Sequence, residues 1–169
     1  MTYFFFLVGP AASGKSSVAK KIRKNLNFNH VEGDSFHSLK NINLMKKGIK
    51  LKSSDRYPWL NKINKNLKSR TKSKTNFIIS CSALKKRYRD ILSKNLKNTY
   101  FFYLRCKKSV LTKRAKSRKH FFPLSLLNDQ VLSFETSKDL FIVNSNNNIN
   151  KVVAKISKKI GNIMKSSKS

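Results

Sequence analysis

The stretch Gly9-Pro10-Ala11-Ala12-Ser13-Gly14-Lys15-Ser16 decides the fold, because it fits the pattern G-x-x-x-x-G-K-[ST] and lies between an expected strand and an expected helix. The apolar run from Tyr3 to Val8 precedes it and indicates a strand buried on both faces of a parallel sheet. After it, Val18, Ile22 and Leu26 recur every four residues, which predicts a helix that begins at the end of the motif. This order of strand, glycine-rich turn and helix predicts a phosphate loop that binds a nucleoside triphosphate. An ordinary Gly/Ser turn is the alternative.

Each part of the loop has an expected role. Glycines 9 and 14 permit backbone angles that direct amide N–H groups at phosphate oxygens, at the positive end of the helix. Lys15 is expected to reach the β- and γ-phosphates, and Ser16 to ligate Mg²⁺. The predicted ATP-binding residues are therefore Gly9, Pro10, Ala11, Ala12, Ser13, Gly14, Lys15, Ser16 and Ser17.

Length and composition predict one domain. The chain has 169 residues, of which 39% are hydrophobic, and no repeat or Pro/Gly-rich linker divides it. We expect a single domain over residues 1–164, followed by a polar tail over residues 165–169. The apolar run before Gly9 is too short for a signal sequence or a membrane span, so a soluble cytoplasmic protein is expected.

The charge balance raises nucleic-acid binding as a hypothesis. The chain carries 38 Lys and Arg against 7 Asp and Glu, which gives a formal net charge of +31. These basic residues are spread along the whole length, the longest run is Lys85-Lys86-Arg87, and no DNA- or RNA-binding motif is present. Dispersed charge of this kind is typical of a solvated surface, so no specific nucleic-acid partner is expected. A basic nucleic-acid-binding module on a kinase fold remains the alternative from a different class.

Cysteine and histidine usage argues against structural metals and disulfides. Cys81 and Cys106 are the only cysteines and form no C-x-x-C spacing, while the three histidines are scattered. Neither a disulfide framework nor a zinc site is therefore indicated.

Strand-like runs alternate with helical patterns along the chain. This alternation predicts a three-layer α/β fold with a parallel sheet and helices on both faces. Ligands of such sheets bind at the carboxyl ends of the strands, so residues that directly follow a strand are the candidates for chemistry. The expected strands are Tyr3 to Val8, His30 to Glu32, Phe77 to Ser80, Tyr100 to Leu104 and Leu140 to Val143.

Asp34 is the candidate catalytic base, because it follows the second expected strand and a glycine. A carboxylate at this strand end can accept the proton of an attacking hydroxyl or hold the Mg²⁺ shell. An Asx-type turn or a helix cap is the alternative. Nearby, His37 can either bond a substrate or brace the Asp34 loop.

A compact turn is expected over Asp55-Arg56-Tyr57-Pro58-Trp59, opening a helix with Pro58 in its first turn. The bidentate guanidinium of Arg56 is suited to grip a small carboxylate. The alternative is a surface cap with a half-buried Trp59.

Two pairs of basic residues follow later strands. Lys85 and Arg89 lie one helical turn apart and are candidates for binding an anionic substrate. Arg114 and Arg118 repeat that spacing, as a lid helix requires if its guanidiniums stabilise a transferring phosphoryl group. A merely solvated basic helix is the alternative.

Taken together, these segments resemble the gluconate kinase family of small phosphate-loop kinases, and the likeness runs from Phe4 to about Ile160. The two most specific strings are Asp55-Arg56-Tyr57-Pro58-Trp59-Leu60 and Cys81-Ser82-Ala83-Leu84-Lys85-Lys86-Arg87-Tyr88-Arg89-Asp90. The others are Gly9 to Ser17; Gly33 to His37 with Asn41, Ile42 and Met45; and His120 to Pro123 with Leu126, Leu127 and Gln130. The chain departs from the family's usual pattern at Ser38, where proline is usual, and at Ser53, where an acidic residue is usual.

The resemblance implies a nucleoside-monophosphate-kinase-like fold with a small helical lid over about residues 113–135. It implies the reaction ATP + D-gluconate → ADP + 6-phospho-D-gluconate, with Mg²⁺, in a dimeric cytoplasmic enzyme. Asp34 would then activate the 6-hydroxyl, Arg56, Lys85 and Arg89 would orient gluconate, and Arg114 and Arg118 would close over the phosphates. Another small-metabolite kinase, acting on shikimate or a different sugar acid, is the alternative within the same class.

Overall fold

The computed structural model describes residues 1–117, 123–146 and 148–167. Its centre is a five-stranded sheet in the order β2-β3-β1-β4-β5, with all neighbouring strands parallel. The strands are β1 (Phe4–Val8), β2 (Asn29–Glu32), β3 (Phe77–Ser80), β4 (Thr99–Arg105) and β5 (Leu140–Asn144). All five predicted strands are confirmed, each to within one residue at either end.

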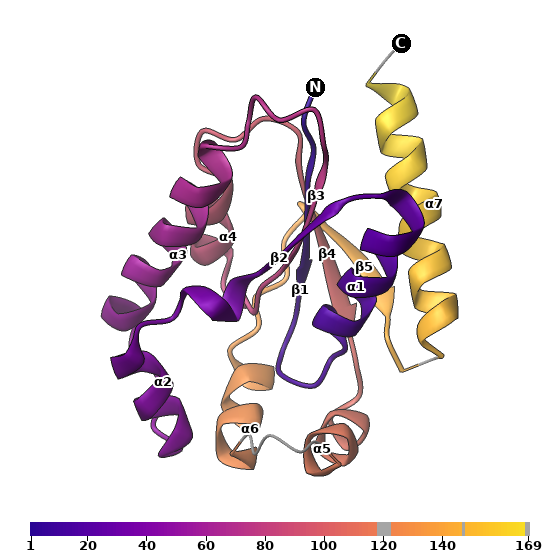
Figure 1. Ribbon diagram of the computed structural model, residues 1–169. Coiled ribbons are helices and arrows are strands. Elements are labelled where there is room, and N and C mark those ends of the chain that lie inside the picture. Colours follow the sequence, from indigo (N-terminus) through magenta and orange to yellow (C-terminus); the bar gives the residue numbers. More distant parts are fainter. Residues whose placement is uncertain (118–122, 147, 168–169) are drawn as a thin grey trace.

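Helices cover both faces of the sheet, so the predicted three-layer α/β architecture is confirmed (Figure 1). One face carries α1 (Lys15–Leu26) and α7 (Ile149–Ser166), and the other carries α3 (Ser53–Lys68) and α4 (Lys86–Ser93). Three short helices gather near the carboxyl ends of the strands: α2 (Leu39–Lys46), α5 (Lys108–Lys116) and α6 (Leu124–Leu132). Both described ends of the chain lie at the opposite end of the molecule.

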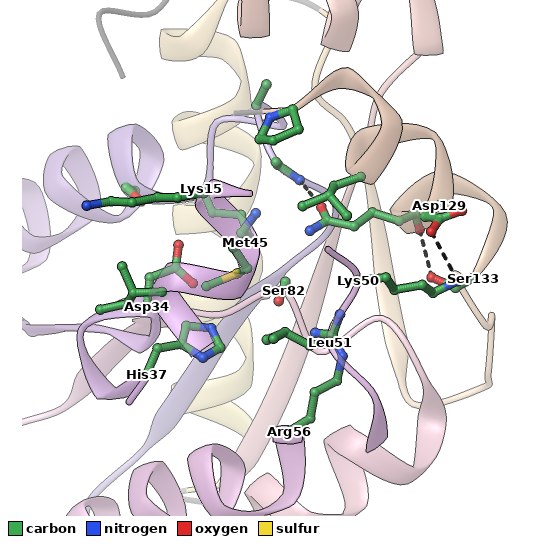
Figure 2. Close-up of a pocket in the computed structure, with 18 of the residues that line it drawn as sticks. Lys15, Asp34, His37, Met45, Lys50, Leu51, Arg56, Ser82, Asp129 and Ser133 are labelled. Atoms are coloured by element: carbon green, nitrogen blue, oxygen red, sulfur yellow. Dashed lines mark hydrogen bonds and ion pairs between the residues drawn. The ribbon is translucent and has the colours of Figure 1, made fainter. Parts of the chain in front are cut away.

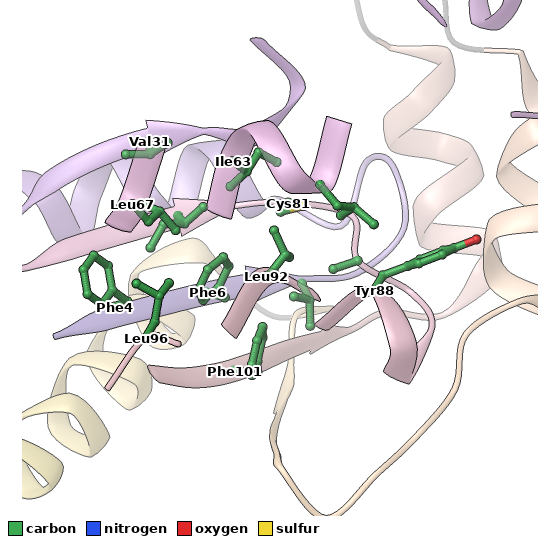
Figure 3. Packing of buried hydrophobic residues seen from close by; sticks show 14 of the residues in the cluster. Phe4, Phe6, Val31, Ile63, Leu67, Cys81, Tyr88, Leu92, Leu96 and Phe101 are labelled. Carbon is green, nitrogen blue, oxygen red and sulfur yellow. The ribbon is translucent and has the colours of Figure 1, made fainter. Parts of the chain in front are cut away.

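The central strand β1 shows why this fold can be predicted from the sequence. Phe4 and Phe6 face a core shared with α3 and α4, part of which is drawn in Figure 3. Phe5 and Leu7 face the second core, which is shared with α1 and α7. Because both faces of β1 are covered, every residue of the strand is buried, and the strand reads as one unbroken apolar run.

The start of α3 differs from the prediction. The carboxylate of Asp55 accepts a hydrogen bond of 2.9 Å from the backbone N–H of Lys52, and this cap starts the helix at Ser53. Pro58 therefore lies inside the helix rather than in its first turn, and the predicted placement of Pro58 is wrong. Ser38 caps α2 from the N-cap position itself, because its hydroxyl accepts from the backbone N–H of Asn41 at 3.2 Å.

The last helix, α7, ends at Ser166 and so reaches two residues into the predicted polar tail. Within the described chain, none of the helices combines the length and the apolar character that crossing a membrane requires.

Candidate active site

A cavity of about 310 Å³ opens at the carboxyl ends of the strands. Its walls come from the phosphate loop, from the segment that follows β2, from α2 and the connection to α3, and from α6 (Figure 2). The lining side chains that carry charge are Lys15, Asp34, Lys46, Lys50, Arg56 and Asp129. Four cationic groups against two carboxylates suit a site for anionic ligands.

The phosphate loop has the predicted form. Gly14 has φ +97°, a left-handed conformation that glycine adopts without strain, and it directly precedes the first residue of α1. The backbone N–H groups at the start of α1 therefore lie at the positive end of a 12-residue helix. The ammonium of Lys15 is held against the loop, where it donates to the carbonyl oxygens of Gly9 at 2.9 Å and Pro10 at 2.8 Å.

Asp34 stands in a single 3-10 turn, η1 (Gly33–Phe36), directly after β2, and lines the cavity together with Lys15 and Ser16. A Cβ on Gly33 would lie 2.6 Å from the carbonyl oxygen of Ser80, so only glycine lets this turn lie against β3. The indole N–H of Trp59 donates to the Gly33 carbonyl oxygen at 2.8 Å. The turn that carries Asp34 is therefore fixed from two sides.

His37 lies on the same cavity wall, and its ring stacks on Trp59 with the ring centroids 4.1 Å apart. Burial, and secondarily the charge of Arg56, lower the pKa of His37 to about 4. The imidazole is therefore neutral near pH 7 and offers one donor and one acceptor. Trp59 is 2% exposed, so it is a core residue and not the half-buried side chain of a surface cap.

Arg56 reaches the cavity from α3, as Figure 2 shows. Burial is the largest influence on its guanidinium and lowers its pKa from the ordinary value. An arginine stays charged despite such a shift, so a partly desolvated cation faces the cavity. Lys46 and Lys50 add two further ammonium groups to the same lining.

Lys85 and Arg89 are not brought to the cavity, to which the segment after β3 contributes Ser82 instead. The Arg89 side chain is fully buried, and its guanidinium donates to the carbonyl oxygens of Ala83 and Leu84, each at 3.2 Å. It also donates to the carbonyl oxygen of Glu135 at 2.9 Å, and its Nε lies 3.4 Å from the carboxylate of Asp139. This geometry corrects the expectation for Arg89: it ties the segment after β3 to the connection between α6 and β5.

Arg114 lies beside a second cavity of about 300 Å³, on the other side of the phosphate loop. Its guanidinium donates to the carbonyl oxygen of Ser145 at 2.9 Å. Ser13 and Ser17 of the loop line the same cavity. Arg118, the other predicted lid cation, lies outside the described residues.

Sequence reasoning did not single out Lys46, Lys50, Asp129 or the side-chain role of Gln130. Gln130 accepts a hydrogen bond of 2.6 Å from the backbone N–H of Ala11 in the phosphate loop. The only signal was the position of Gln130 within one of the family-like strings, which gave no reason for a glutamine there. Lys46 and Lys50 carried no signal, because they are two among 38 Lys and Arg residues spread along the chain.

Comparisons with known proteins agree with this geometry. A family model described as "AAA domain" matches residues 8–121. The thermoresistant gluconokinase of Escherichia coli (strain K12) is 37% identical over 138 residues, which cover 81% of this chain and 77% of that protein. The chain belongs to the gluconokinase family.

Solved structures of similar proteins extend the likeness to the whole fold. The structure of a gluconokinase from Sinorhizobium meliloti 1021 superposes with a TM-score of 0.83 at 32% identity, covering 98% of this chain and 97% of that one. The unliganded structure of a sugar kinase from Janibacter sp. HTCC2649 gives a TM-score of 0.87 at 29% identity, covering 92% of each chain. The phosphate-loop kinase fold expected of the gluconokinase family is confirmed.

Proposed function

We propose that this protein transfers the γ-phosphoryl group of ATP to the 6-hydroxyl of D-gluconate, giving 6-phospho-D-gluconate and ADP. The observation that carries the proposal is the meeting of Lys15, Ser16, Asp34 and Arg56 on one cavity, in a chain of the gluconokinase family. Those four residues provide a phosphate contact, a metal ligand, a proton acceptor and a carboxylate contact, which phosphorylation of a sugar acid requires.

The nucleotide binds across the phosphate loop in this proposal. The hydroxyl of Ser13 is buried and has no hydrogen-bond partner within the described chain, although it lines the second cavity. A buried polar group of this kind needs a partner, and a nucleotide in that cavity supplies one. Arg114 then contacts the nucleotide beside the loop, while Lys15 leaves the loop carbonyls for the β- and γ-phosphates.

Mg²⁺ fits the oxygen ligands present. Ser16 offers a hydroxyl and Asp34 a carboxylate on the same cavity, and hard oxygen donors are what Mg²⁺ prefers. When bound, the ion neutralises charge on the β- and γ-phosphates. No group of three or more His, Cys, Asp or Glu suited to a metal occurs among the described residues.

Gluconate binds on the side of the cavity opposite the loop, with its carboxylate toward the cations. Arg56 makes the bidentate contact, and Lys46 and Lys50 add to the positive field. Asp34 accepts the proton of the 6-hydroxyl as that oxygen attacks the γ-phosphorus, and the O–P bond to ADP breaks in the same step. His37 hydrogen-bonds a hydroxyl of the sugar acid. Because its imidazole is neutral, it adds no further positive charge beside Asp34.

A coupled ADP-release assay with a panel of sugar acids and shikimate tests the proposal. We expect the highest kcat/KM with D-gluconate, and a higher value with another acceptor would overturn the assignment of the substrate.

Lys15→Ala should abolish turnover without unfolding the protein. Asp34→Asn should lower kcat about 10²- to 10⁴-fold while nucleotide affinity changes little, because a general base acts in the transition state. An equal loss in kcat and nucleotide affinity would move Asp34 from base to metal ligand.

We also propose a cytoplasmic homodimer with no specific nucleic-acid partner, as the family likeness implies. Light scattering after size exclusion at several concentrations measures the oligomeric state. A salt-dependent affinity for nucleic acid without ATP consumption would instead favour the basic binding module.

A further inference from the structure

The helix α6 touches both sides of the main cavity through two adjacent residues, Asp129 and Gln130. The side-chain carbonyl of Gln130 accepts from the Ala11 N–H at 2.6 Å, on the side of the phosphate loop. The carboxylate of Asp129 lies 3.3 Å from the ammonium of Lys50. This is the acceptor side of the cavity, where gluconate, the phosphoryl acceptor, is proposed to bind. Neighbouring residues on a helix point about 100° apart, so one short helix can reach both sides.

The contact between Ala11 and Gln130 has a defined polarity. A backbone N–H only donates, so the oxygen of the Gln130 carboxamide must face the loop. The bond joins residues that are 119 positions apart in the sequence, and Gln130 also lines the cavity. A shift of α6 therefore moves Ala11 of the phosphate loop, three residues before Gly14.

Apolar packing strengthens the same connection. Ala12 is buried in a cluster with Leu111 and Ala115 of α5 and with Leu127 of α6. Ala12 has φ +62°, a left-handed conformation that costs an alanine about 1 kcal/mol and persists where its surroundings enforce it. The conformation of the phosphate loop thus depends on the helices packed against it.

On the acceptor side, the connection between α2 and α3 packs against the start of α6. A Cβ on Gly48 would lie 3.7 Å from the Pro123 side chain, which is van der Waals distance. Lys50 and Leu51, from the same connection, line the cavity. The Lys50–Asp129 pair is half-exposed, so its contribution to stability alone is small, but it can report a change in this connection.

We propose that α6 couples the two substrate sites, with Gln130 as the residue that positions the phosphate loop and Asp129 as the contact to the acceptor side. The inference deepens the proposed function and rests on it. An acceptor that orders residues 47–52 stabilises the position of α6, and α6 stabilises the loop through Gln130. Each substrate then raises the affinity of the site for the other, and by linkage the two factors are equal.

Calorimetric titration measures this coupling without turnover. D-gluconate is titrated into the full chain with and without Mg²⁺ and a non-hydrolysable imido analogue of ATP, and the analogue is titrated with and without gluconate. For the wild type we expect each ligand to raise the affinity for the other at least about fivefold, which is the lower end of measured coupling factors. For Gln130→Leu we expect the coupling factor to fall below about twofold while the affinity for gluconate alone changes less than about threefold; the affinity for the ATP analogue alone should also fall, because the phosphate loop loses its contact at Ala11.

Matched variants make the result specific. Asn128→Ala removes an exposed side chain from the same helix and should keep the full coupling factor. Asp129→Asn should lower the factor, because it removes the charge that faces Lys50. If Gln130→Leu fails to fold in a thermal melt, Gln130→Asn serves instead, since its shorter side chain cannot reach Ala11.

The failure of this inference is distinguishable from failure of the proposed function. A wild type that phosphorylates gluconate but shows a factor near one would overturn the coupling alone. A folded Gln130 variant with the full factor would also overturn it and leave Gln130 a purely structural residue. A wild type that neither binds nor phosphorylates gluconate would overturn both the acceptor assignment and the coupling to it.

Discussion

The indole N–H of Trp59 donates a 2.8 Å hydrogen bond to the carbonyl oxygen of Gly33, so a core residue of α3 holds the turn that carries Asp34. The same indole ring stacks on His37. One side chain thus fixes both ends of η1, and the position of the proposed base depends on a residue that does not itself line the cavity.

Trp59→Phe tests this dependence. The substitution keeps an aromatic ring near His37 but leaves the buried Gly33 carbonyl without its donor, so we expect a loss of about 1–3 kcal/mol in the free energy of unfolding. Because Asp34 is then less well placed, kcat should fall more than the KM for ATP rises. Urea unfolding and steady-state kinetics measure the two effects. A destabilised variant with wild-type kcat would show that Trp59 serves only the core.

Gly33→Ala should be severe, because its Cβ would lie 2.6 Å from a backbone oxygen that cannot move without disturbing β3. We expect strong destabilisation, or a folded protein with little activity because the turn is displaced. Gly161→Ala is the matched control: Gly161 lies inside α7 with nothing within 4 Å of the added Cβ. That variant should gain about 0.5–1 kcal/mol in stability with unchanged kinetics. Similar behaviour of the two variants would contradict the close-approach argument.

The sequence predicts the parts of this fold whose signals are local. β1 reads as a strand because both faces are covered, and the phosphate loop is fixed by glycine spacing next to it. Asp34 and Arg56 are found because each lies in a short string next to a recognisable element. The sequence cannot supply contacts between distant residues, such as Ala11 with Gln130, because neither residue type has a periodic or spacing signal for its partner.

Arg89 shows a second limit of sequence reasoning. Its spacing from Lys85 predicts a shared face, yet Tyr88, Arg89 and Leu92 are all buried on α4. A pattern of charges does not reveal whether carbonyl oxygens and a carboxylate elsewhere in the fold will surround one of them. The start of α3 was misplaced for a related reason, since the capping role of Asp55 depends on the backbone N–H of Lys52.

Paired substitutions separate the two arginines. Arg89→Met leaves Asp139 and several carbonyl oxygens without their partner, so we expect a loss of about 3–5 kcal/mol in the free energy of unfolding. Below its melting temperature, this variant should keep a near wild-type KM for gluconate. Arg56→Met should instead raise that KM at least about tenfold, as loss of a charged contact to a carboxylate does. A specific rise in KM for Arg89→Met would restore Arg89 to the substrate site.

The pH dependence of stability should carry a contribution from His37. In the folded protein burial lowers its pKa to about 4, whereas an unfolded histidine titrates near 6.5. Between these values the unfolded state binds more protons, so the stabilising contribution is complete above pH 6.5 and is lost as the pH falls toward 4. From pH 7 to pH 5 the wild type should lose about 1–2 kcal/mol more than His37→Asn, allowing for partial exposure. Urea unfolding at the two pH values measures the difference, and equal losses would contradict a neutral, buried His37.

Cys106, but not the buried Cys81, should report nucleotide binding through its rate of alkylation. Burial raises the pKa of Cys81 to about 12, so iodoacetamide should not modify it in the folded protein. Cys106 is only partly buried, and its sulfur accepts a weak 3.8 Å hydrogen bond from Arg114 beside the second cavity. If the nucleotide binds there, Mg²⁺ and ADP should slow the alkylation of Cys106, which mass spectrometry of the labelled peptide measures. Cys106→Ser should remove the native-state labelling altogether. An alkylation rate that ADP leaves unchanged would place the nucleotide away from Arg114. It would also contradict the part of the proposal that puts the nucleotide on this side of the phosphate loop.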